Sequence, residues 1–447
     1  RGWRVTIQEA ASALRSRQVS SRELTQHALD QIARHNPGLN AFITVTGESA
    51  LARARELDRE LAAGVDRGPL HGIPIAHKDL IRTKGVRTTS GSKLFADFVP
   101  DSDAPIVRKL ADAGAVTVGK TGLHELAYGV TSDNPHFGAV RNPRDRERSP
   151  GGSSGGSAAA VGSEMAFMAT GTDTGGSIRI PAAFCGVAGL KPTYGLVDRA
   201  GIQPLGFSLD HVGPIARTVG DVRTSFEAMA GDVPRKPAPA NLKDLRIGLP
   251  ENFYFTQVAA DVCAAVRKAA AAAEQLGARV IPVRVPDVDA LNAAGRVILL
   301  AEASALYAPY IHRREDFGSD VLSLLDQGRL VPAIDYVNAQ RIRKMLADDF
   351  HALFKTIDCL FTPATATTAP LVGQKQVELD GEKQDSRLAN TRLVRGINVL
   401  GFPALAIPCG ESAGLPVGLQ IVGRPLEENL LLAMGEGLEP FLGSDTN

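Results

Sequence analysis

The chain has 447 residues, 44% of them apolar, and is long enough to bury a hydrophobic core without disulfides or a structural metal. Its 49 Lys and Arg residues equal its 49 Asp and Glu residues, so the formal net charge is zero. This balance argues against direct binding to nucleic acid or to an anionic membrane, because such proteins carry a net basic surface. The four cysteines form no C-x-x-C pair, which is typical of buried thiols in a reducing, cytoplasmic compartment.

Two amphipathic helices are predicted at the start of the chain, over about residues 6–36. In the second helix Ser20 and Glu23 form an S-x-x-E capping box, and Pro37 is expected to end it. No apolar run in the chain reaches the length of about 18 residues that a membrane-spanning helix needs. The sequence therefore predicts no membrane partner.

Helical and strand patterns then alternate. A helix is predicted at 103–114, a strand at 115–119, and a strand, an Ala-rich helix and a strand at 245–250, 258–276 and 278–283. This βαβ order predicts a parallel, helix-covered sheet. Residues 231–244 form the one Pro-rich polar linker, which either separates two domains or joins two halves of one sheet.

Three short motifs each match a known pattern in the wrong context. The segment 114–121 fits the P-loop pattern, but its β-branched residues predict a strand and not a phosphate-binding loop. The segment 152–156 fits G-x-S-x-G, but a polar, proline-broken segment precedes it where a nucleophile elbow needs a strand. His124-Glu125 begins like H-E-x-x-H, yet Tyr128 stands where the second histidine would be, so no metal site is expected.

The stretch GTDTGGSIR, residues 171–179, carries a stronger signal. It places Ser177 after two glycines, where successive N–H groups can point at one spot, as an oxyanion hole requires. A serine nucleophile needs a base, and no histidine lies in this Gly-rich region. Lys78 follows an apolar run, and burial can depress a lysine pKa far enough to leave the amine neutral. An exposed lysine at the end of an edge strand is the alternative.

These residues together resemble the amidase signature family. The resemblance rests on Lys78 in GIPIAHKD, Ser153 and Ser154 in GGSSGGSAAAVG, and Ser177 in its glycine-rich stretch. It continues through the N-terminal helices and through LGFPALAIPCG and LPVGLQIVGRP, and so covers nearly the whole chain. It implies a single α/β domain over residues 1–447, with a signature core at about 70–200, in which a large mixed sheet is covered by helices on both faces and the linker 231–244 is internal.

The resemblance also implies roles for these residues and no cofactor. Ser177 would be the acyl nucleophile, Lys78 the general base, and Ser153, on a cis peptide bond, the relay between them. Ser154 would hold the loop. The N–H groups of Thr174, Gly175, Gly176 and Ser177 would form the oxyanion hole.

The resemblance leaves the substrate open between two interpretations. One is a free-standing hydrolase of a small amide; the other is the glutaminase-like A subunit of a tRNA-dependent amidotransferase, which works with partner subunits. Arg343, in an A-Q-x-x-R stretch, and Tyr310 resemble substrate contacts of those subunits, whereas Thr391 stands near where they carry an aspartate for the substrate amino group. An arginine without that aspartate suggests a small amide that bears a carboxylate but no ammonium.

Two further expectations complete this interpretation. Tyr128 is a third candidate for substrate contact. A surface role for Arg343 on its helix is the alternative to substrate binding, and a homodimer or a small partner subunit is expected.

Overall fold

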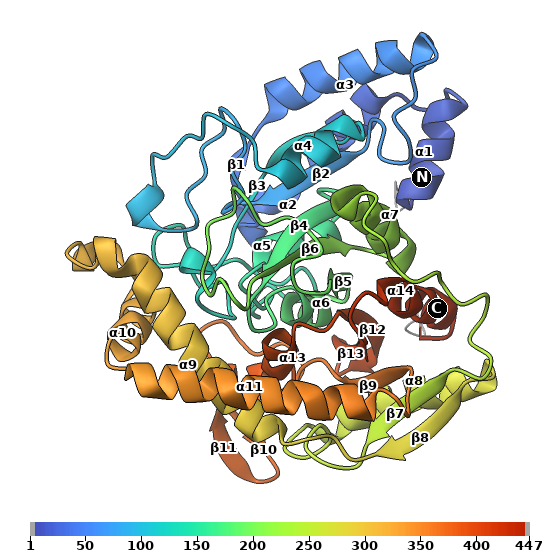
Figure 1. Ribbon diagram of the computed structural model, residues 1–447. Helices are drawn as coiled ribbons and strands as arrows, with labels where there is room; N and C mark the ends of the chain where they lie inside the picture. The colour runs from blue at the N-terminus through green and yellow to red at the C-terminus, as the bar shows by residue number, and fades with distance from the viewer. Residues whose placement is uncertain (1–4, 443–447) are drawn as a thin grey trace.

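The structure is a computed structural model that describes residues 5–442 (Figure 1). Its strands are β1 Phe42–Val45, β2 Pro74–Lys78, β3 Val116–Thr121, β4 Met168–Asp173, β5 Ala188–Lys191, β6 His211–Ala216, β7 Arg246–Pro250, β8 Arg279–Val283, β9 Cys359–Pro363, β10 Gln376–Leu379, β11 Glu382–Asp385, β12 Ala404–Ser412 and β13 Leu415–Gly423. Its α-helices are α1 Ile7–Arg15, α2 Ser21–Leu39, α3 Gly47–Ala62, α4 Pro105–Asp112, α5 Gly155–Gly162, α6 Arg179–Cys185, α7 Val219–Ala230, α8 Ala260–Gln275, α9 Val288–Tyr307, α10 Ser319–Gly328, α11 Ala333–Leu353, α12 Ser386–Thr391, α13 Arg395–Leu400 and α14 Glu428–Leu442.

An 11-stranded sheet runs through the centre of the molecule, in the order β1-β3-β2-β4-β6-β5-β12-β13-β9-β7-β8 (Figure 1). The sheet is mixed: β2 pairs in parallel with β3 and β4, and β7 with β8 and β9, whereas the other pairs are antiparallel. The predicted β7-α8-β8 unit is confirmed as parallel. The hairpin β10–β11 lies outside this sheet. The α/β fold with a large mixed sheet is therefore as the resemblance implied.

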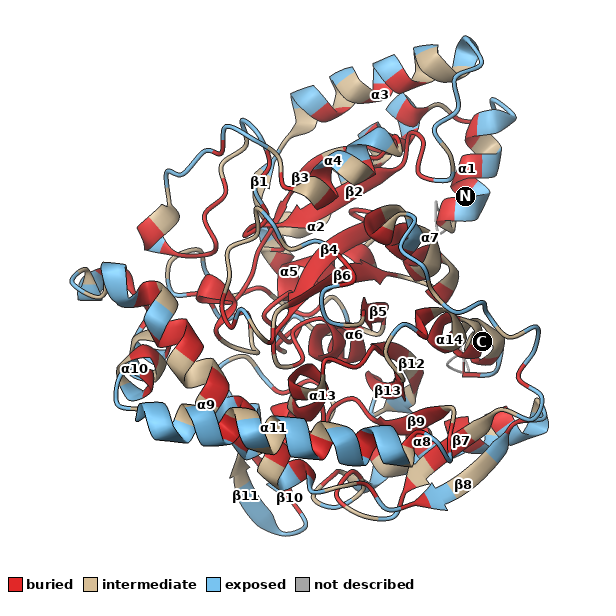
Figure 2. Ribbon diagram, in the orientation of Figure 1, coloured by how far each residue is buried: buried red, intermediate tan, exposed pale blue. Residues whose placement is uncertain are grey.

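Alternate strand residues point to opposite faces of the sheet and enter two different cores. Ile75, Met168 and Leu405 belong to the larger core, whereas their neighbours Ala76, Ala169 and Ala406 belong to the smaller one. Helices α2, α3, α5 and α6 contribute to the smaller core, and α7, α8 and α14 contribute to the larger core. Burial is accordingly concentrated in the central strands, while the outer sides of α3 and α11 are exposed (Figure 2).

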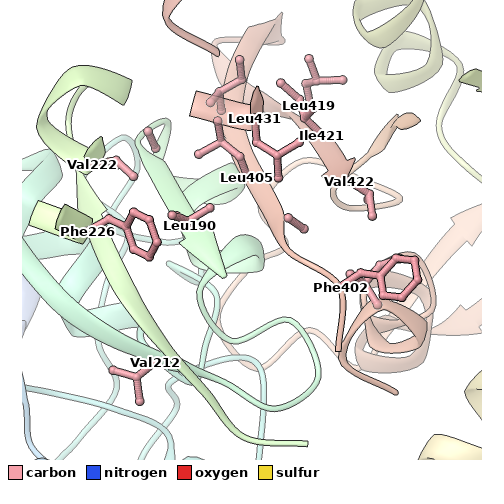
Figure 3. Packing of buried hydrophobic residues seen from close by; sticks show 14 of the residues in the cluster. Leu190, Val212, Val222, Phe226, Phe402, Leu405, Leu419, Ile421, Val422 and Leu431 are labelled. Atoms are coloured by element: carbon pink, nitrogen blue, oxygen red, sulfur yellow. The ribbon is translucent and has the colours of Figure 1, made fainter. Parts of the chain in front are cut away.

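The larger core is formed by long apolar side chains between the sheet and its covering helices. Figure 3 shows Phe226 of α7 beside Leu190 of β5, and Leu431 of α14 beside Leu405 of β12. All four of these side chains are fully buried. Burial of one such side chain contributes about 1.5–3 kcal/mol, so these contacts fix the helices on the sheet that carries the site.

The capping signal of the second N-terminal helix is confirmed, but its predicted end is wrong. Ser20 and Glu23 form the reciprocal capping box of α2. The helix passes through Pro37 and ends at Leu39, because the amide of Asn40 still donates to the carbonyl of Asn36 at 2.8 Å. Asn40 then caps the helix with φ of 51°, a left-handed conformation that asparagine tolerates.

The segments singled out by short motifs have ordinary structural roles. Residues 116–121 of the P-loop match form strand β3, and Lys120 donates to the carbonyl of Ile81 and to the Thr88 hydroxyl, both at 2.7 Å. Glu125 accepts from the backbone amide of Gly318 at 2.7 Å. The linker 231–244 joins α7 to β7, and strands on both sides of it belong to the same sheet. Over residues 5–442, no helix has the length and apolar character needed to cross a membrane.

Candidate active site

Three segments far apart in the sequence meet at the carboxyl ends of β2 and β4. These two strands are parallel neighbours, so the residues that end them lie at the same edge of the sheet. Lys78 ends β2, and Thr172 and Asp173 end β4. Ser177 lies in the turn that leads from β4 to α6, and Ser153 precedes the start of α5.

The amine of Lys78 contacts three hydroxyl groups. Its Nζ atom lies 2.7 Å from Ser153 Oγ, 2.8 Å from Ser154 Oγ and 2.7 Å from Thr172 Oγ1. The side chain is fully buried, and burial lowers the pKa of Lys78 well below its ordinary value, although the carboxylates of Asp173 and Asp210 partly oppose this shift. A neutral amine at this position can accept a proton from the Ser153 hydroxyl.

The loop that carries Ser153 is tied to both neighbouring segments. The peptide bond between Gly152 and Ser153 is cis. The amide of Ser154 donates to the carbonyl of Ser177 at 3.2 Å, and the Ser154 hydroxyl donates to the carbonyl of Thr172 at 3.1 Å. Ser154 therefore holds the loop against the β4 end and against the turn of Ser177.

The turn of Ser177 is organised by a buried carboxylate. Asp173 accepts hydrogen bonds from the amides of Gly176 at 2.8 Å and Ile178 at 3.0 Å, and from Arg179 Nη2 at 2.9 Å. Although burial raises it, the pKa of Asp173 lies below its ordinary value because Arg179 is adjacent. The carboxylate is therefore ionised and fixes the backbone between β4 and α6.

This arrangement changes the predicted set of oxyanion donors. The Gly176 amide is directed at Asp173 and is not free to point at a substrate. The amides of Thr174, Gly175 and Ser177 have no acceptor among residues 5–442. A side chain at Gly176, which has φ of 116°, would collide with Val394, so only glycine allows this turn.

A cavity opens beside Ser177. Its empty volume is about 760 Å³, including the part open to solvent, which suits a small molecule. Thr174, Gly175 and Ser177 lie on one side of it, and Tyr128 and Arg395 also line it. The Tyr128 hydroxyl is buried without a hydrogen-bond partner in the described part of the chain, and burial raises the pKa of Tyr128.

Comparison with known proteins agrees with this geometry. A family model described as Amidase matches residues 23–432. The chain belongs to the amidase signature family. It is therefore a C–N hydrolase by family.

Individual relatives carry two kinds of name. The chain is 42% identical to the A subunit of glutamyl-tRNA(Gln) amidotransferase from Azoarcus sp. (strain BH72), over 96% of each chain. The solved A subunit of this amidotransferase from Thermotoga maritima is 32% identical, with a TM-score of 0.81 over 99% of this chain and 96% of that chain. A solved structure described simply as an amidase is 35% identical, with a TM-score of 0.93 over 98% of this chain and 100% of that chain.

Two residues expected to contact the substrate lie away from the cavity of this family member. Arg343, on α11, donates to the carbonyl of Ser208 at 3.0 Å and is not part of the cavity lining. Tyr310 packs edge-to-face on Phe95, with 5.5 Å between ring centroids, and also lies outside the lining. The structure differs from the sequence expectation here because α11 packs along the outer side of α9, so an aligned motif on α11 does not reach Ser177.

Sequence reasoning missed three contributors to the site. Thr172 is the third partner of Lys78, and Asp173 with Arg179 holds the turn; all three lie within the motif GTDTGGSIR, so the motif contained a signal for them. The third contributor is Arg395, which gave no such signal. It reaches the cavity only because α13 packs against α9 on that side.

The role of Asp173 leads to a stability prediction. Asp173→Asn should lower the free energy of unfolding by about 3–5 kcal/mol, because it leaves the buried guanidinium of Arg179 without its counter-charge. Urea unfolding at neutral pH measures this effect. Asp385→Asn, at the partly exposed start of α12, is the control and should change stability by about 1 kcal/mol or less, the cost of a helix cap. Equal effects of the two substitutions would contradict a buried ion pair at Asp173.

Proposed function

We propose that this chain hydrolyses the C–N bond of a small non-peptide amide through an acyl-enzyme formed on Ser177. The observation that carries the proposal is the 2.7 Å contact between Lys78 Nζ and Ser153 Oγ, made by a lysine that is fully buried. A buried neutral amine bonded to a serine hydroxyl is a general base with a proton relay. The continuous sheet on both sides of the segment 231–244 supports a single catalytic domain.

The proposed reaction uses each residue at a definite step. Lys78 accepts the proton of Ser153 as Ser153 accepts the proton of Ser177, whose Oγ then attacks the amide carbon. The oxyanion that forms is stabilised by the amides of Thr174, Gly175 and Ser177, and each such donor is worth about 100- to 1000-fold in rate. Ser153 returns a proton to the leaving nitrogen and is reprotonated by Lys78. Water, activated by the same relay, then releases the acid from Ser177.

The substrate class is supported by two different lines of comparison. The names of the curated relatives favour the glutaminase-like A subunit of a tRNA-dependent amidotransferase over a free-standing hydrolase, since the relative at 42% identity spans 96% of both chains. The solved amidase, with a TM-score of 0.93 against 0.81 for the solved A subunit, favours the free-standing hydrolase. Both candidates share the acyl-enzyme chemistry and differ in whether glutamine is the substrate and whether partner subunits are required.

The isolated chain tests this proposal. We expect it to release ammonia from small primary amides without a partner protein, and to be labelled on Ser177 by a serine-directed fluorophosphonate. Mass spectrometry of the labelled peptide locates the site, and heat-unfolded protein is the control for non-specific labelling. A label on Ser154 would contradict the proposed nucleophile. Turnover of glutamine alone would assign the A-subunit function.

A further inference from the structure

An arginine lies beside the turn that precedes Ser177. Arg395 begins α13, and its Nε atom lies 3.9 Å from the position that a Cβ atom on Gly175 would occupy. Gly175 is two residues before Ser177 and lines the same cavity. The guanidinium therefore stands at the wall of the cavity next to the reacting serine.

This guanidinium has no carboxylate within ion-pair distance among residues 5–442. Its Nη2 atom donates to the Thr391 hydroxyl at 3.3 Å, while its Nε atom is buried without a partner in the same part of the chain. Burial, together with the smaller effect of the neighbouring Arg296 cation, lowers the pKa of Arg395 to about 10. Arg395 nevertheless remains protonated at neutral pH. A buried cation that is repelled by a neighbour and lacks a carboxylate is costly unless a ligand completes it.

The cavity as a whole is cationic. Arg296 and Arg387 line it together with Arg395, and its lining contains no Asp or Glu among the residues that the structure describes. The Nε atom of Arg387 lies 3.6 Å from the carboxylate of Asp385, which is outside the lining. By contrast, the deeply buried guanidinium of Arg179 is paired with Asp173. The chain thus pairs its structural arginine and leaves the arginine in the cavity unpaired.

We infer that Arg395 binds a carboxylate of the substrate, with the unpartnered Tyr128 hydroxyl as a second donor, so that the substrate is a small amide bearing a carboxylate and no ammonium. This inference rests on the proposed function and names its substrate class. A guanidinium presents paired N–H donors that match a carboxylate. An ammonium would meet three arginines and no acid, which disfavours glutamine. Thr391 is a positioning residue, because it holds Arg395 and does not itself carry charge.

The test compares amides that differ in one charge. Malonamate, succinamate and glutaramate carry a carboxylate; propanamide, butanamide and pentanamide are their neutral counterparts; asparagine and glutamine add an ammonium to succinamate and glutaramate. We expect wild type to prefer one of the carboxylated amides over both its neutral and its ammonium-bearing counterparts. Arg395→Gln should lower kcat/KM for that substrate by about 30- to 1000-fold and for neutral amides by less than about 3-fold.

The matched control is Arg341→Gln, which removes the same charge from the exposed side of α11 and should change neither class of substrate. Arg395→Lys should recover part of the lost activity toward the carboxylated amide, since it restores the charge without the paired donors. Equal losses for charged and neutral amides in Arg395→Gln would overturn the inference. Faster turnover of glutamine than of glutaramate by wild type would also overturn it.

A binding measurement separates this inference from the proposed function. Malonate, succinate or glutarate should protect Ser177 from fluorophosphonate labelling in wild type but not in Arg395→Gln. Labelling of Ser177 without protection by any of these dicarboxylates would overturn only the carboxylate inference. Failure to label Ser177 in wild type would overturn the proposed function and, with it, this inference.

Discussion

Replacing Ser177 with Ala is expected to lower kcat for every amide substrate by about 10⁴-fold or more, because no acyl-enzyme can form. Ser177 is the one serine of this site that lines the cavity, whereas Ser153 and Ser154 contact the Lys78 amine. Stopped-flow or single-turnover assays measure the loss, and intact-mass spectrometry should show no acylated protein. Ser323→Ala, at an exposed position on α10, is the matched control and should leave the rate unchanged.

The relay serine should show a smaller loss. Ser153→Ala retains the nucleophile and the oxyanion donors and removes only the proton path to Lys78, so we expect a loss of about 10²- to 10⁴-fold in kcat. Slow acylation of Ser177 should remain detectable in this variant. Activity of Ser177→Ala above that of Ser153→Ala would exchange the two roles and contradict the proposed mechanism.

Activity should rise with pH as the Lys78 amine loses its proton. Burial lowers the pKa of Lys78, so the neutral, reactive form is populated at a lower pH than for an exposed lysine. Below the apparent pKa, kcat/KM should increase by about tenfold per pH unit, and above it the rate should level off. This apparent pKa belongs to the coupled unit of Lys78, Ser153 and Ser177 and not to one residue.

Substitutions of Lys78 test the base directly. Lys78→Arg keeps a protonated cation at all accessible pH values and Lys78→Met has no base, so both should lose at least about 10³-fold in kcat/KM and the rising limb of the pH profile. Lys344→Arg, at an exposed position on α11, should retain the wild-type profile. Cooperative urea unfolding of the variants shows whether they remain folded. A wild-type pH limb in Lys78→Met would remove Lys78 as the base.

Local signals in the sequence were sufficient for several elements of the fold. The capping box of Ser20 and Glu23 begins α2, and the β7-α8-β8 unit follows from its strand and helix patterns, because these features depend on residues close in the chain. The end of α2 was missed because Pro37 in the last turn removes one donor without preventing Asn40 from completing the helix. The order of the 11 strands could not be derived, since it depends on contacts across hundreds of residues.

The amino-acid sequence by itself determined the family of this protein and the three segments that bring Lys78, Ser153 and Ser177 to the candidate site, because each segment is a contiguous motif. Only the tertiary structure decided which arginine lines the substrate cavity. Arg343 has the motif and lies on the outer helix α11, whereas Arg395 has no motif and stands beside Gly175. The physical reason is that a cavity wall is formed by helices packed on the sheet, so the position of α13, more than 200 residues after Ser177 as the numbering shows, places the charge.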